Sequence, residues 1–272
     1  MNLNNKTILI TGASRGIGRA IALRCAQDGA RIVIASKTSD PHPVLPGTIH
    51  TVAEEVVAAG GEALALAVDV RDEAAIAGAV AAAVERFGTI DALVNNAGAI
   101  SLTDTASTAM KRYDLMMAVN VRATFACSQA CLPHLKTSGG HILNLSPPID
   151  LNPRWLAPHV AYTMSKFGMS MCTRGMAAEF APHGIAVNSL WPRTLIATDA
   201  LRAIGGMDLA RGGRTTGIMG EAAYALLTTP PADRTGEWLI DEDVLTERGI
   251  TDLEQWRVDP DTPLIQDLFL GD

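Results

Sequence analysis

Two residues whose types and spacing could do acid–base chemistry are Tyr162 and Lys166, four positions apart in the segment YTMSK. On a helix, this spacing places both side chains on one face. A tyrosine with an ordinary pKa of about 10 is a poor base near neutral pH, but a neighbouring ammonium group favours the phenolate and lowers that pKa. The pair could therefore exchange a proton with an alcohol or a carbonyl group. An incidental pair on an amphipathic helix is the alternative interpretation.

A glycine-rich turn near the N-terminus, TGASRGIG, has glycines at positions 12, 16 and 18 and follows an apolar run. Such a turn lets backbone N–H groups approach a pyrophosphate and lets the next helix start close to the sheet. A tight turn without a ligand is the alternative, but a place between a strand and a helix is typical of dinucleotide-binding sites. Together with Tyr162 and Lys166, the turn predicts hydride transfer at a nicotinamide ring.

The end of the second apolar run indicates which nicotinamide cofactor is bound. The run closes with Ala35-Ser36-Lys37, and no acidic residue follows until Asp40. A site selective for NAD usually has a carboxylate here to hold the ribose 2′-hydroxyl, whereas Arg15 and Lys37 could attract a 2′-phosphate. We therefore expect NADP(H) in preference to NAD(H). The alternative is that Lys37 is simply solvated.

Polar residues also end the third and fourth apolar runs. Asp69, in VDV, could accept hydrogen bonds from an adenine amino group, and Asn96, in NNAG, lies where the backbone could approach the adenosine ribose. Either residue could instead only terminate a strand in a turn.

The elements that must position these residues follow from the apolar pattern. Seven short, near-continuous apolar runs predict strands buried on both faces: Thr7–Thr11, Arg31–Ala35, Ala63–Val68, Ala92–Asn95, His141–Leu145, Ile185–Leu190 and Glu237–Ile240. Helix-period stretches lie between them: Ile17–Gln27, Thr51–Ala58, Glu73–Phe87, Ala109–Cys131, Tyr162–Phe180 and Gly220–Leu227. The alternation predicts an α/β fold of the Rossmann type, a doubly wound parallel sheet of about seven strands with helices on both faces.

No linker or repeat divides the sequence, so we expect residues 1–272 to form a single dinucleotide-binding oxidoreductase domain. Three segments interrupt the pattern. Lys37–Thr48 contains three prolines and is expected to be irregular. Pro192–Met219, a glycine-rich stretch after a strand, is a candidate substrate lid covering residues 192–219. The acidic C-terminal tail, residues 241–272, is expected to cross the surface or a partner subunit, with simple fraying as an equal alternative.

Composition excludes several classes of protein. The chain has 272 residues, 48% of them apolar, and a net charge of −7, which argues against disorder and against nucleic-acid binding. No membrane span is expected from the apolar runs, nor does the N-terminus resemble a signal peptide. Cys127 and Cys131 could share a helix face and bind a metal or form a redox pair, but buried thiols are favoured and no metal site is expected. The expected location is the cytoplasm.

TGASRGIG, NNAG, the asparagine of VNV (Asn120) and YTMSK together resemble the short-chain dehydrogenase/reductase family over essentially the whole chain. The resemblance implies that Tyr162 is the acid/base, that Lys166 holds the nicotinamide ribose, and that Asn120 holds a water that relays a proton to solvent. It also implies cofactor contacts for the remaining matching positions: Gly12, Ser14, Arg15, Gly16, Ile17 and Gly18 at the pyrophosphate, Lys37 at the 2′-phosphate, Asp69 at the adenine and Asn96 at the adenosine ribose.

Two departures from the family pattern affect the reactive end. The serine that binds the substrate oxygen aligns with Pro147, which has neither a hydroxyl nor an N–H donor. Either Ser146, one position earlier, turns in to replace it, or the site lacks a donor, which typically costs about 10²- to 10³-fold in rate. The usual Pro-Gly after the sixth strand is Pro192-Arg193. Arg193 either points to solvent or brings positive charge to the substrate entrance, where an acyl-CoA phosphate or a carboxylate could bind.

These observations predict an NADP(H)-dependent oxidoreductase that interconverts a secondary alcohol and a carbonyl on a small-molecule substrate. The alternative is a catalytically impaired NADP(H)-binding sensor or interaction module that lost the donor at Pro147. Methionines on the two helices that frame the site in the family make a lipid-like substrate (fatty-acyl or steroid) reasonable, although core packing is the more usual reason for them. They are Met110, Met116, Met117, Met164, Met169, Met171 and Met176. By analogy with the family, we expect a homodimer or homotetramer.

Overall fold

The computed structural model describes residues 2–41 and 45–271, and within them seven strands form one parallel sheet. The strands are β1 (Thr7–Thr11), β2 (Arg31–Ser36), β3 (Glu62–Ala67), β4 (Ala92–Asn95), β5 (Gly140–Asn144), β6 (Ile185–Trp191) and β7 (Trp238–Ile240). Their order in the sheet is β3-β2-β1-β4-β5-β6-β7. The order reverses between β1 and β4, and at such a point an open α/β sheet forms a crevice beyond the carboxyl ends of its strands.

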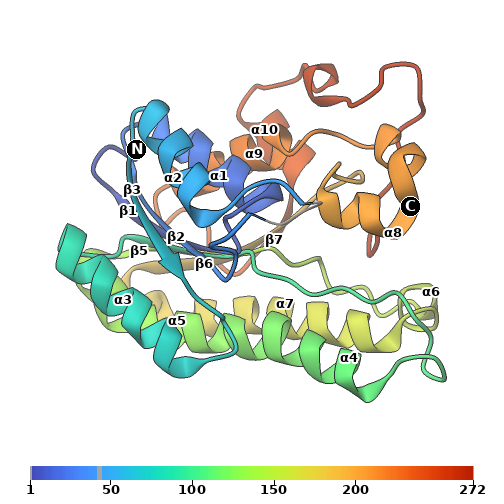
Figure 1. The fold of residues 1–272 in the computed structure, drawn as a ribbon, viewed down its shortest axis with the longest axis horizontal. Coiled ribbons are helices and arrows are strands. Elements are labelled where there is room, and N and C mark those ends of the chain that lie inside the picture. Colours follow the sequence, from blue (N-terminus) through green and yellow to red (C-terminus); the bar gives the residue numbers. More distant parts are fainter. Residues whose placement is uncertain (1, 42–44, 272) are drawn as a thin grey trace.

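Helices cover both faces of this sheet (Figure 1). One layer holds α1 (Gly16–Ala26), α2 (Ile49–Ala58), α9 (Gly217–Leu227) and α10 (Asp241–Glu247), and the other holds α3 (Glu73–Phe87), α5 (Ala123–Ser138) and α7 (Val160–Phe180). Three further helices lie toward the carboxyl edge of the sheet: α4 (Met110–Met116), the short α6 (Pro153–Leu156) and α8 (Asp199–Arg211). The Rossmann-type fold predicted from the sequence is therefore confirmed.

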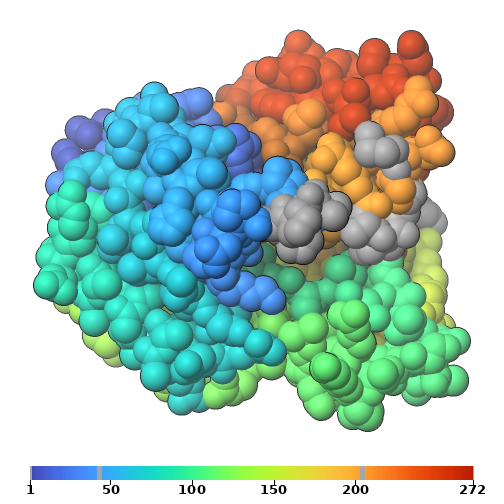
Figure 2. Space-filling model, in the orientation of Figure 1, coloured from blue at the N-terminus to red at the C-terminus, as the bar shows by residue number. Residues whose placement is uncertain are grey.

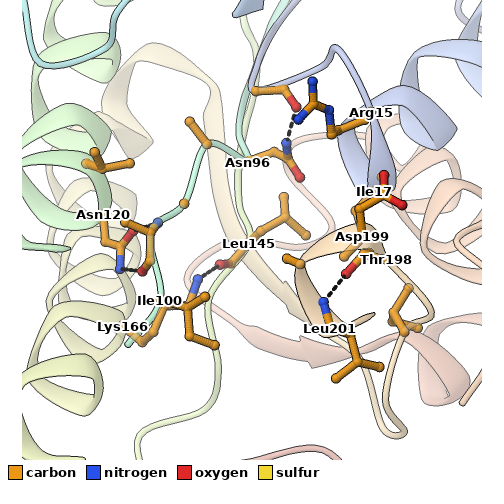
Figure 3. Close-up of a pocket in the computed structure, with 18 of the residues that line it drawn as sticks. Arg15, Ile17, Asn96, Ile100, Asn120, Leu145, Lys166, Thr198, Asp199 and Leu201 are labelled. Atoms are coloured by element: carbon orange, nitrogen blue, oxygen red, sulfur yellow. Dashed lines mark hydrogen bonds between the residues drawn. The ribbon is translucent and has the colours of Figure 1, made fainter. Parts of the chain in front are cut away.

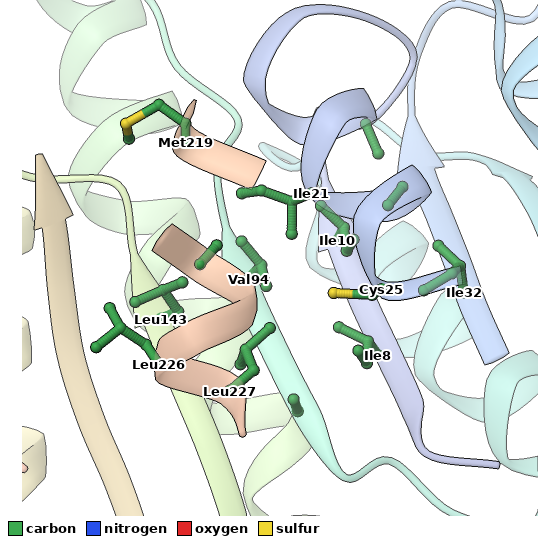
Figure 4. Packing of buried hydrophobic residues seen from close by; sticks show 14 of the residues in the cluster. Ile8, Ile10, Ile21, Cys25, Ile32, Val94, Leu143, Met219, Leu226 and Leu227 are labelled. Atoms are coloured by element: carbon green, nitrogen blue, oxygen red, sulfur yellow. The ribbon is translucent and has the colours of Figure 1, made fainter. Parts of the chain in front are cut away.

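The core has two layers because successive side chains of a strand point to opposite faces. Ile8 and Ile10 of β1 pack with Ile21 and Cys25 of α1 and with α9, as Figure 4 shows. Leu9, between them in sequence, packs on the other face against α3 and α5. Cys127 and Cys131 belong to that second cluster, where burial raises the pKa of the Cys127 thiol to about 12. The interpretation of these cysteines as buried thiols is confirmed.

The strands begin and end within one residue of the predicted positions, whereas one predicted helix differs. The stretch expected as a single helix, Ala109–Cys131, is α4, then a π-helical segment η1 (Met117–Arg122), then α5, which continues to Ser138. By length and composition alone, Met110–Ser138 could cross a membrane. Within the protein it packs along α7 and α3 (Figure 1), so it is no clear membrane span.

The interrupting segments are more ordered than the sequence indicates. Residues 37–41 and 45–48 are irregular, as expected, while the rest of the Lys37–Thr48 prediction lies outside the described residues. The candidate lid contains a helix that was not predicted, α8, bent at Gly206, where φ is +74°. The tail contains a second unpredicted helix, α10. Near its end the tail returns to the loop after β6, where Gln266 pairs with Thr194. The tail is therefore not frayed over its described length.

Candidate active site

A cavity of about 840 Å³ opens at the carboxyl ends of the strands, and it contains both the glycine-rich turn and Tyr162. In Figure 2 the surface is hollowed between the blue and cyan N-terminal part of the chain and the green helical segment. Nearly all the predicted site residues line this cavity: Gly12, Ser14, Arg15, Gly16, Ile17, Lys37, Asp69, Asn96, Asn120, Tyr162 and Lys166. Gly18 and Ser146 do not line it. The structure thus brings the glycine-rich turn and the Tyr162–Lys166 pair together in one cavity, as the sequence predicts.

The glycine-rich turn forms a cradle that only glycine can build. Gly12 has φ +67°, and a Cβ there would lie 2.9 Å from the Cα of Ala97. Gly18 is buried below the turn, where a Cβ would lie 2.5 Å from Asn96 Nδ2 and 2.9 Å from the Gly12 carbonyl oxygen. Gly18 therefore lets α1 start close to the sheet, and it lies behind the turn, outside the cavity lining. Because α1 begins at Gly16, its unpaired N–H groups face the cavity, as anion binding requires.

Arg15 supplies the positive charge of this cradle. Its Nη2 donates to the carbonyl oxygen of Gly47 at 3.1 Å, while its Nε is buried without a hydrogen-bond partner. A buried, unpaired guanidinium N–H is costly unless a ligand accepts from it. The residues present therefore fit a dinucleotide phosphate. Ser14 is held in the same turn by a 3.0 Å hydrogen bond between its Oγ and Ser36 Oγ.

The adenosine end of the cavity is lined by cations and one paired carboxylate. Lys37 and Asp69 both line it, as predicted, but Asp69 is already bound by Arg71, whose Nε donates to Oδ1 at 2.9 Å. These hydrogen bonds lower the pKa of Asp69 to about 2. Arg71 also lines the cavity, and the sequence analysis did not single it out. Its position two residues after Asp69 was the signal in the sequence that could have placed Arg71 in this site.

Asn96 braces the glycine-rich turn from β4. Its Nδ2 donates to the carbonyl oxygens of Thr11 and Gly12, at 2.9 and 3.1 Å, and its backbone N–H donates to Thr11 Oγ1 (Figure 3). The amide N–H groups are thus used within the protein. Asn96 fixes the shape of the cradle in addition to lining the cavity.

Tyr162 and Lys166 both project from α7 into the cavity, as the four-residue spacing predicts. Lys166 Nζ donates to the carbonyl oxygen of Leu145 at 2.5 Å (Figure 3). Burial lowers the pKa of Lys166 to about 7, and the nearby Asp267 carboxylate opposes this shift. The pKa of Tyr162 is raised, first by burial and then by Asp267. Burial and the Asp267 carboxylate thus act against the lowering of the tyrosine pKa that is predicted from Lys166 and a bound nicotinamide ring.

Asn120 lies in the π-helical segment η1 with its side chain fully hydrogen-bonded. Its Oδ1 accepts from the Ala99 N–H at 2.8 Å, and its Nδ2 donates to the Ala99 carbonyl oxygen and to Ser165 Oγ. Its own carbonyl oxygen accepts from Thr124. The side chain therefore ties the loop after β4 to α7. π-Helical segments are rare and occur frequently at functional sites.

Ser146 corrects one prediction. Its side chain is fully buried outside the cavity lining, and its Oγ is hydrogen-bonded to Ser189 Oγ at 2.7 Å. Ser189 is bonded in turn to Thr173, which accepts from Asn144 Nδ2. Ser146 is thus the end of a buried polar chain between β5, β6 and α7 and does not turn in to replace the serine missing at Pro147. The cause is a tight turn just after β5 ends at Asn144: the Ser146 N–H donates back to the Asn144 carbonyl oxygen at 3.0 Å, and the side chain of Ser146 enters the buried chain.

Arg193 points away from the cavity. Its side chain pairs with Asp243 of α10 at 2.5 Å, and it is absent from the lining. Its backbone is clamped: the N–H donates to Asp241 Oδ1 at 2.8 Å, and the carbonyl oxygen accepts from the Asp267 N–H at 3.0 Å. The idea that Arg193 binds a substrate anion at the entrance is therefore wrong, because the acidic start of α10 holds the side chain.

The C-terminal tail contributes lining residues that the sequence analysis missed. Ile265, Gln266, Asp267 and Leu268 line the cavity, and Phe269 packs on Tyr162 with the ring centroids 6.1 Å apart. Burial raises the pKa of Asp267 to about 7. No motif marks these residues. The apolar run LFL at the end of an otherwise polar tail was the one signal that this segment is buried.

The remaining lining is mostly apolar and comes from α4, η1, α8 and the loops around them. Met116 lies there, whereas the half-buried Met117 lies outside the lining, Met169 and Met176 are core residues, and Met110, Met164 and Met171 are exposed. The apolar lining also includes Ile100, Leu102, Leu115, Val119, Leu195, Leu201, Leu209 and Ile265. Of the seven methionines considered in the sequence, only Met116 is therefore placed to touch a substrate. No group of three potential metal ligands is found among residues 2–41 and 45–271.

The family follows from the whole pattern: a cradle for a dinucleotide joined by one cavity to a tyrosine–lysine pair. A family model described as short chain dehydrogenase matches residues 6–207, so the chain belongs to the short-chain dehydrogenase family of oxidoreductases, which use nicotinamide cofactors.

Within the family, the chain is similar to hydroxysteroid dehydrogenase-like protein 2 of Danio rerio, 56% identical over 265 residues. The match covers 97% of this chain but 63% of that protein, so the chain spans less than two thirds of this relative. In the sequence, the segments NLSPPIDLNP and GEWLIDEDVL resemble the dehydrogenase part of that protein, and the match over 265 residues confirms this resemblance.

Solved structures agree with this assignment. A crystal structure from Xanthomonas campestris superimposes with a TM-score of 0.97, at 54% identity and with complete coverage of both chains. A metagenomic short-chain oxidoreductase in complex with NADP superimposes with a TM-score of 0.73, at 28% identity, covering 88% of this chain and 97% of that one.

Proposed function

We propose that this chain is an NADP(H)-dependent oxidoreductase that interconverts a secondary alcohol and a carbonyl on a lipid-like substrate. The observation that carries the proposal is the single cavity in which the glycine-rich turn and the Tyr162–Lys166 pair meet. A nicotinamide cofactor bound there supplies or accepts hydride. The protein's own residues then have to bind the cofactor, orient the substrate and move one proton.

The proton step belongs to Tyr162. A buried phenol with a raised pKa keeps its proton near neutral pH, which suits it to protonate a carbonyl oxygen as that oxygen gains negative charge. Lys166, held one helical turn away on the Leu145 carbonyl, orients the site and stabilises that charge. A lysine with a pKa near 7 can also return the proton to Tyr162 through solvent.

The preference for NADP(H) rests on charge at the adenosine end. Arg15, Lys37 and Arg71 line that end, and the carboxylate there, Asp69, is paired with Arg71. The end of β2 is Ser36, so no carboxylate of that strand repels a 2′-phosphate. Positive charge attracts the phosphate, and a planar guanidinium can bind it with two hydrogen bonds.

The lipid-like substrate class rests on the lining of the reactive end. Leucines, isoleucines and Met116 from α4, α8 and the C-terminal tail form most of that wall. Arg112 of α4 lies in the same lining and is exposed, so an amphiphile could keep an anionic group near solvent while its apolar part is buried. A fatty-acyl or steroid derivative has this shape.

One observation favours a second candidate, a cofactor-binding sensor or interaction module with impaired catalysis. Pro147 carries no hydroxyl and Ser146 is buried in the polar chain, so the family's substrate-binding serine has no replacement among β5 and the loop that follows it. In that case NADP(H) binds but no carbonyl is reduced.

A comparison of two tyrosine variants separates these candidates. Tyr162→Phe removes the hydroxyl in the cavity, and Tyr224→Phe removes a matched hydroxyl that bonds Asp28 on the far side of α1. We expect Tyr162→Phe to lose about 10²- to 10⁴-fold in NADPH-dependent turnover of a panel of lipid carbonyls, with an unchanged NADPH dissociation constant by fluorescence titration. Tyr224→Phe should retain activity. Equal turnover by the wild type, Tyr162→Phe and Tyr224→Phe would refute the role of Tyr162. NADPH binding by the wild type without any turnover would favour the sensor.

We further propose that the chain forms a homodimer or homotetramer. Exposed apolar side chains of α4, α5 and α7 support this: Met110 is 65% exposed, Phe125 54% and Met171 65%. Light scattering during size-exclusion chromatography gives the mass directly, and a monomer at micromolar concentration would contradict the proposal.

A further inference from the structure

The reactive end of the cavity contains Tyr162, which matches the acid–base position of the family motif, but the serine that would share the substrate oxygen is absent. Pro147 occupies its place, and Ser146 is bonded away from the cavity. An oxyanion that forms beside Tyr162 still needs a second donor, since removing such a donor typically costs about 10²- to 10³-fold in rate. Another side chain of the lining must therefore be considered for this task.

Asp267 is a carboxyl group delivered to this place by the C-terminal tail. It lines the cavity together with Tyr162 and Lys166, and its charge acts on the pKa values of both. Phe269, two residues further on, packs on the ring of Tyr162. Residues 268 and 269 form a turn in which Phe269 has φ +70°, and this turn lays the Phe269 ring on the tyrosine ring while Asp267 stays in the cavity lining.

The tail holds Asp267 in a fixed position. The Asp267 N–H donates to the Arg193 carbonyl oxygen at 3.0 Å, and the Leu195 N–H donates to the Ile265 carbonyl oxygen at 2.9 Å. Trp191 Nε1 donates to the carbonyl oxygen of Leu268 at 2.9 Å. Backbone bonds on both sides of Asp267 therefore anchor it to the loop after β6, and a preorganised group costs little to reorient during a reaction.

Burial of Asp267 is the main reason why its carboxyl can carry a proton, because it raises the pKa to about 7. The Leu268 N–H, which donates to Oδ1 at 2.6 Å, lowers that pKa, Asp241 at the start of α10 raises it, and Lys166 of α7 lowers it. Tyr162 of α7 is neutral near pH 7 and does not oppose the proton. A neutral carboxylic acid is a hydrogen-bond donor, whereas a carboxylate can only accept.

We infer that Asp267, as a carboxylic acid, donates the second hydrogen bond to the substrate oxygen and so takes the part of the missing serine. This inference rests on the proposed function. In the carbonyl-reducing direction, hydride adds to the carbonyl carbon, the C=O π pair moves to the oxygen, and that oxygen takes the proton of Tyr162. Asp267 keeps its own proton, and its hydrogen bond strengthens as charge develops on the oxygen.

Three variants test this role. Asp267→Asn keeps a donor and removes the titration, whereas Asp267→Ala removes both, and Tyr162→Phe reports on the proposed function itself. Below about pH 6, where the wild-type carboxyl is protonated, we expect Asp267→Ala to lose about 10²- to 10³-fold in kcat and Asp267→Asn to stay close to wild type. Above about pH 8 the wild type should slow as its carboxyl ionises, while Asp267→Asn keeps its rate.

A stability measurement gives a readout that does not depend on turnover. A carboxyl whose pKa is raised on folding stabilises the fold below its unfolded pKa of about 4, and that contribution is lost as pH rises through about 7. The Tm of Asp267→Asn relative to wild type should therefore increase with pH across this window and level off above it. A Tm difference that is the same at every pH would show that the Asp267 carboxyl is ionised in the fold throughout this range, and it would overturn the inference, because a carboxylate can only accept hydrogen bonds.

The outcomes are distinct. Wild-type turnover by Asp267→Ala below pH 6, with Tyr162→Phe inactive, would overturn the inference and leave the proposed function intact. Equal losses in Asp267→Asn and Asp267→Ala would also overturn it, because the carboxylate would then act as an anion that keeps Lys166 charged. Full activity of Tyr162→Phe would remove the proposed function and this inference together.

Discussion

The two ends of the cavity are built in different ways from the same chain. The cofactor end comes from the first hundred residues, where the turn after β1 and the ends of β2, β3 and β4 contribute neighbouring positions of the sheet edge. The reactive end is assembled from α7, the loop after β6 and the C-terminal tail, which are far apart in the sequence. Short, contiguous motifs encode the first end, and only tertiary folding creates the second.

This difference also separates two kinds of chemistry. The proposed cofactor end presents backbone N–H groups and cations, which can bind a phosphate without needing a proton to move. The reactive end holds three groups whose pKa values are displaced by burial: Tyr162, Lys166 and Asp267. Perturbed titratable groups cluster where proton transfer takes place. The cofactor end should therefore tolerate pH changes that alter the reactive end.

The largest loss of NADPH binding is expected when the space below the glycine-rich turn is filled. Gly18→Ala places a Cβ 2.5 Å from Asn96 Nδ2 and 2.9 Å from the Gly12 carbonyl oxygen, an overpacking that typically costs about 1–3 kcal/mol. Since the displaced atoms form the cradle, we expect at least about tenfold weaker NADPH binding, measured by fluorescence titration. Gly78→Ala, in α3 with no atom near its Cβ, is the matched control and should raise the Tm slightly. Unchanged binding in Gly18→Ala would contradict the geometry of the cradle.

Charge reversal at Lys37 sharpens the comparison between the two cofactors. Lys37→Glu should raise the dissociation constant of NADPH by about 10- to 100-fold, since a hydrogen bond to a charged group contributes about 1.5–3 kcal/mol. NADH, which lacks the 2′-phosphate, should bind almost as before. Lys111→Glu, with the same charge change on the exposed face of α4 outside the cavity lining, should alter neither value. If both cofactors weaken equally in Lys37→Glu, Lys37 does not select NADP.

At the reactive end, Asp241 should make stability depend on pH. Its carboxyl is fully buried, Oδ2 has no hydrogen-bond partner, and burial raises its pKa to about 7. The stability it contributes is therefore present at low pH and lost as pH rises through about 7. Asp241→Asn, which keeps an acceptor for the Arg193 N–H, should gain a few degrees of Tm over wild type at about pH 8 and little at about pH 5. A pH-independent difference in a thermal unfolding series would show that Asp241 is ionised in the fold.

The smallest effect on turnover is expected at Ser146. Ser146→Ala removes one hydrogen bond of the buried chain to Ser189, which should cost about 1 kcal/mol of stability. Turnover and NADPH affinity should stay at the wild-type level, because Ser146 lies outside the cavity lining. A loss of turnover above about tenfold, without a matching loss of folded protein, would return Ser146 to the chemistry.

The sheet and the cofactor end could be predicted from the sequence because they depend on local signals. Apolar runs mark the seven strands to within one residue, and Gly12 and Gly16 are needed for backbone conformations with positive φ. The four-residue spacing of Tyr162 and Lys166 places both in the cavity for the same reason, since a helix fixes their relative position.

The reactive end could not be predicted, because its residues are brought together by distant parts of the chain. Ser146 and Pro147 follow the end of β5, and the tight turn there, in which the Ser146 N–H donates to the Asn144 carbonyl oxygen, is not visible in the sequence. Helix α8 was missed because glycines lower helix propensity, and Gly206 does bend it. Asp267 carries no motif at all; its position depends on the packing of Phe269 among the aromatic rings around Tyr162.

A crystal structure of the NADPH complex tests the central claim most directly, because that claim is that one cavity joins the glycine-rich turn to Tyr162. We predict the diphosphate against the backbone of the turn, the 2′-phosphate near Lys37 and the nicotinamide ring beside the hydroxyl of Tyr162. A nicotinamide ring bound outside the cavity, or a diphosphate bound away from the turn, would contradict the account.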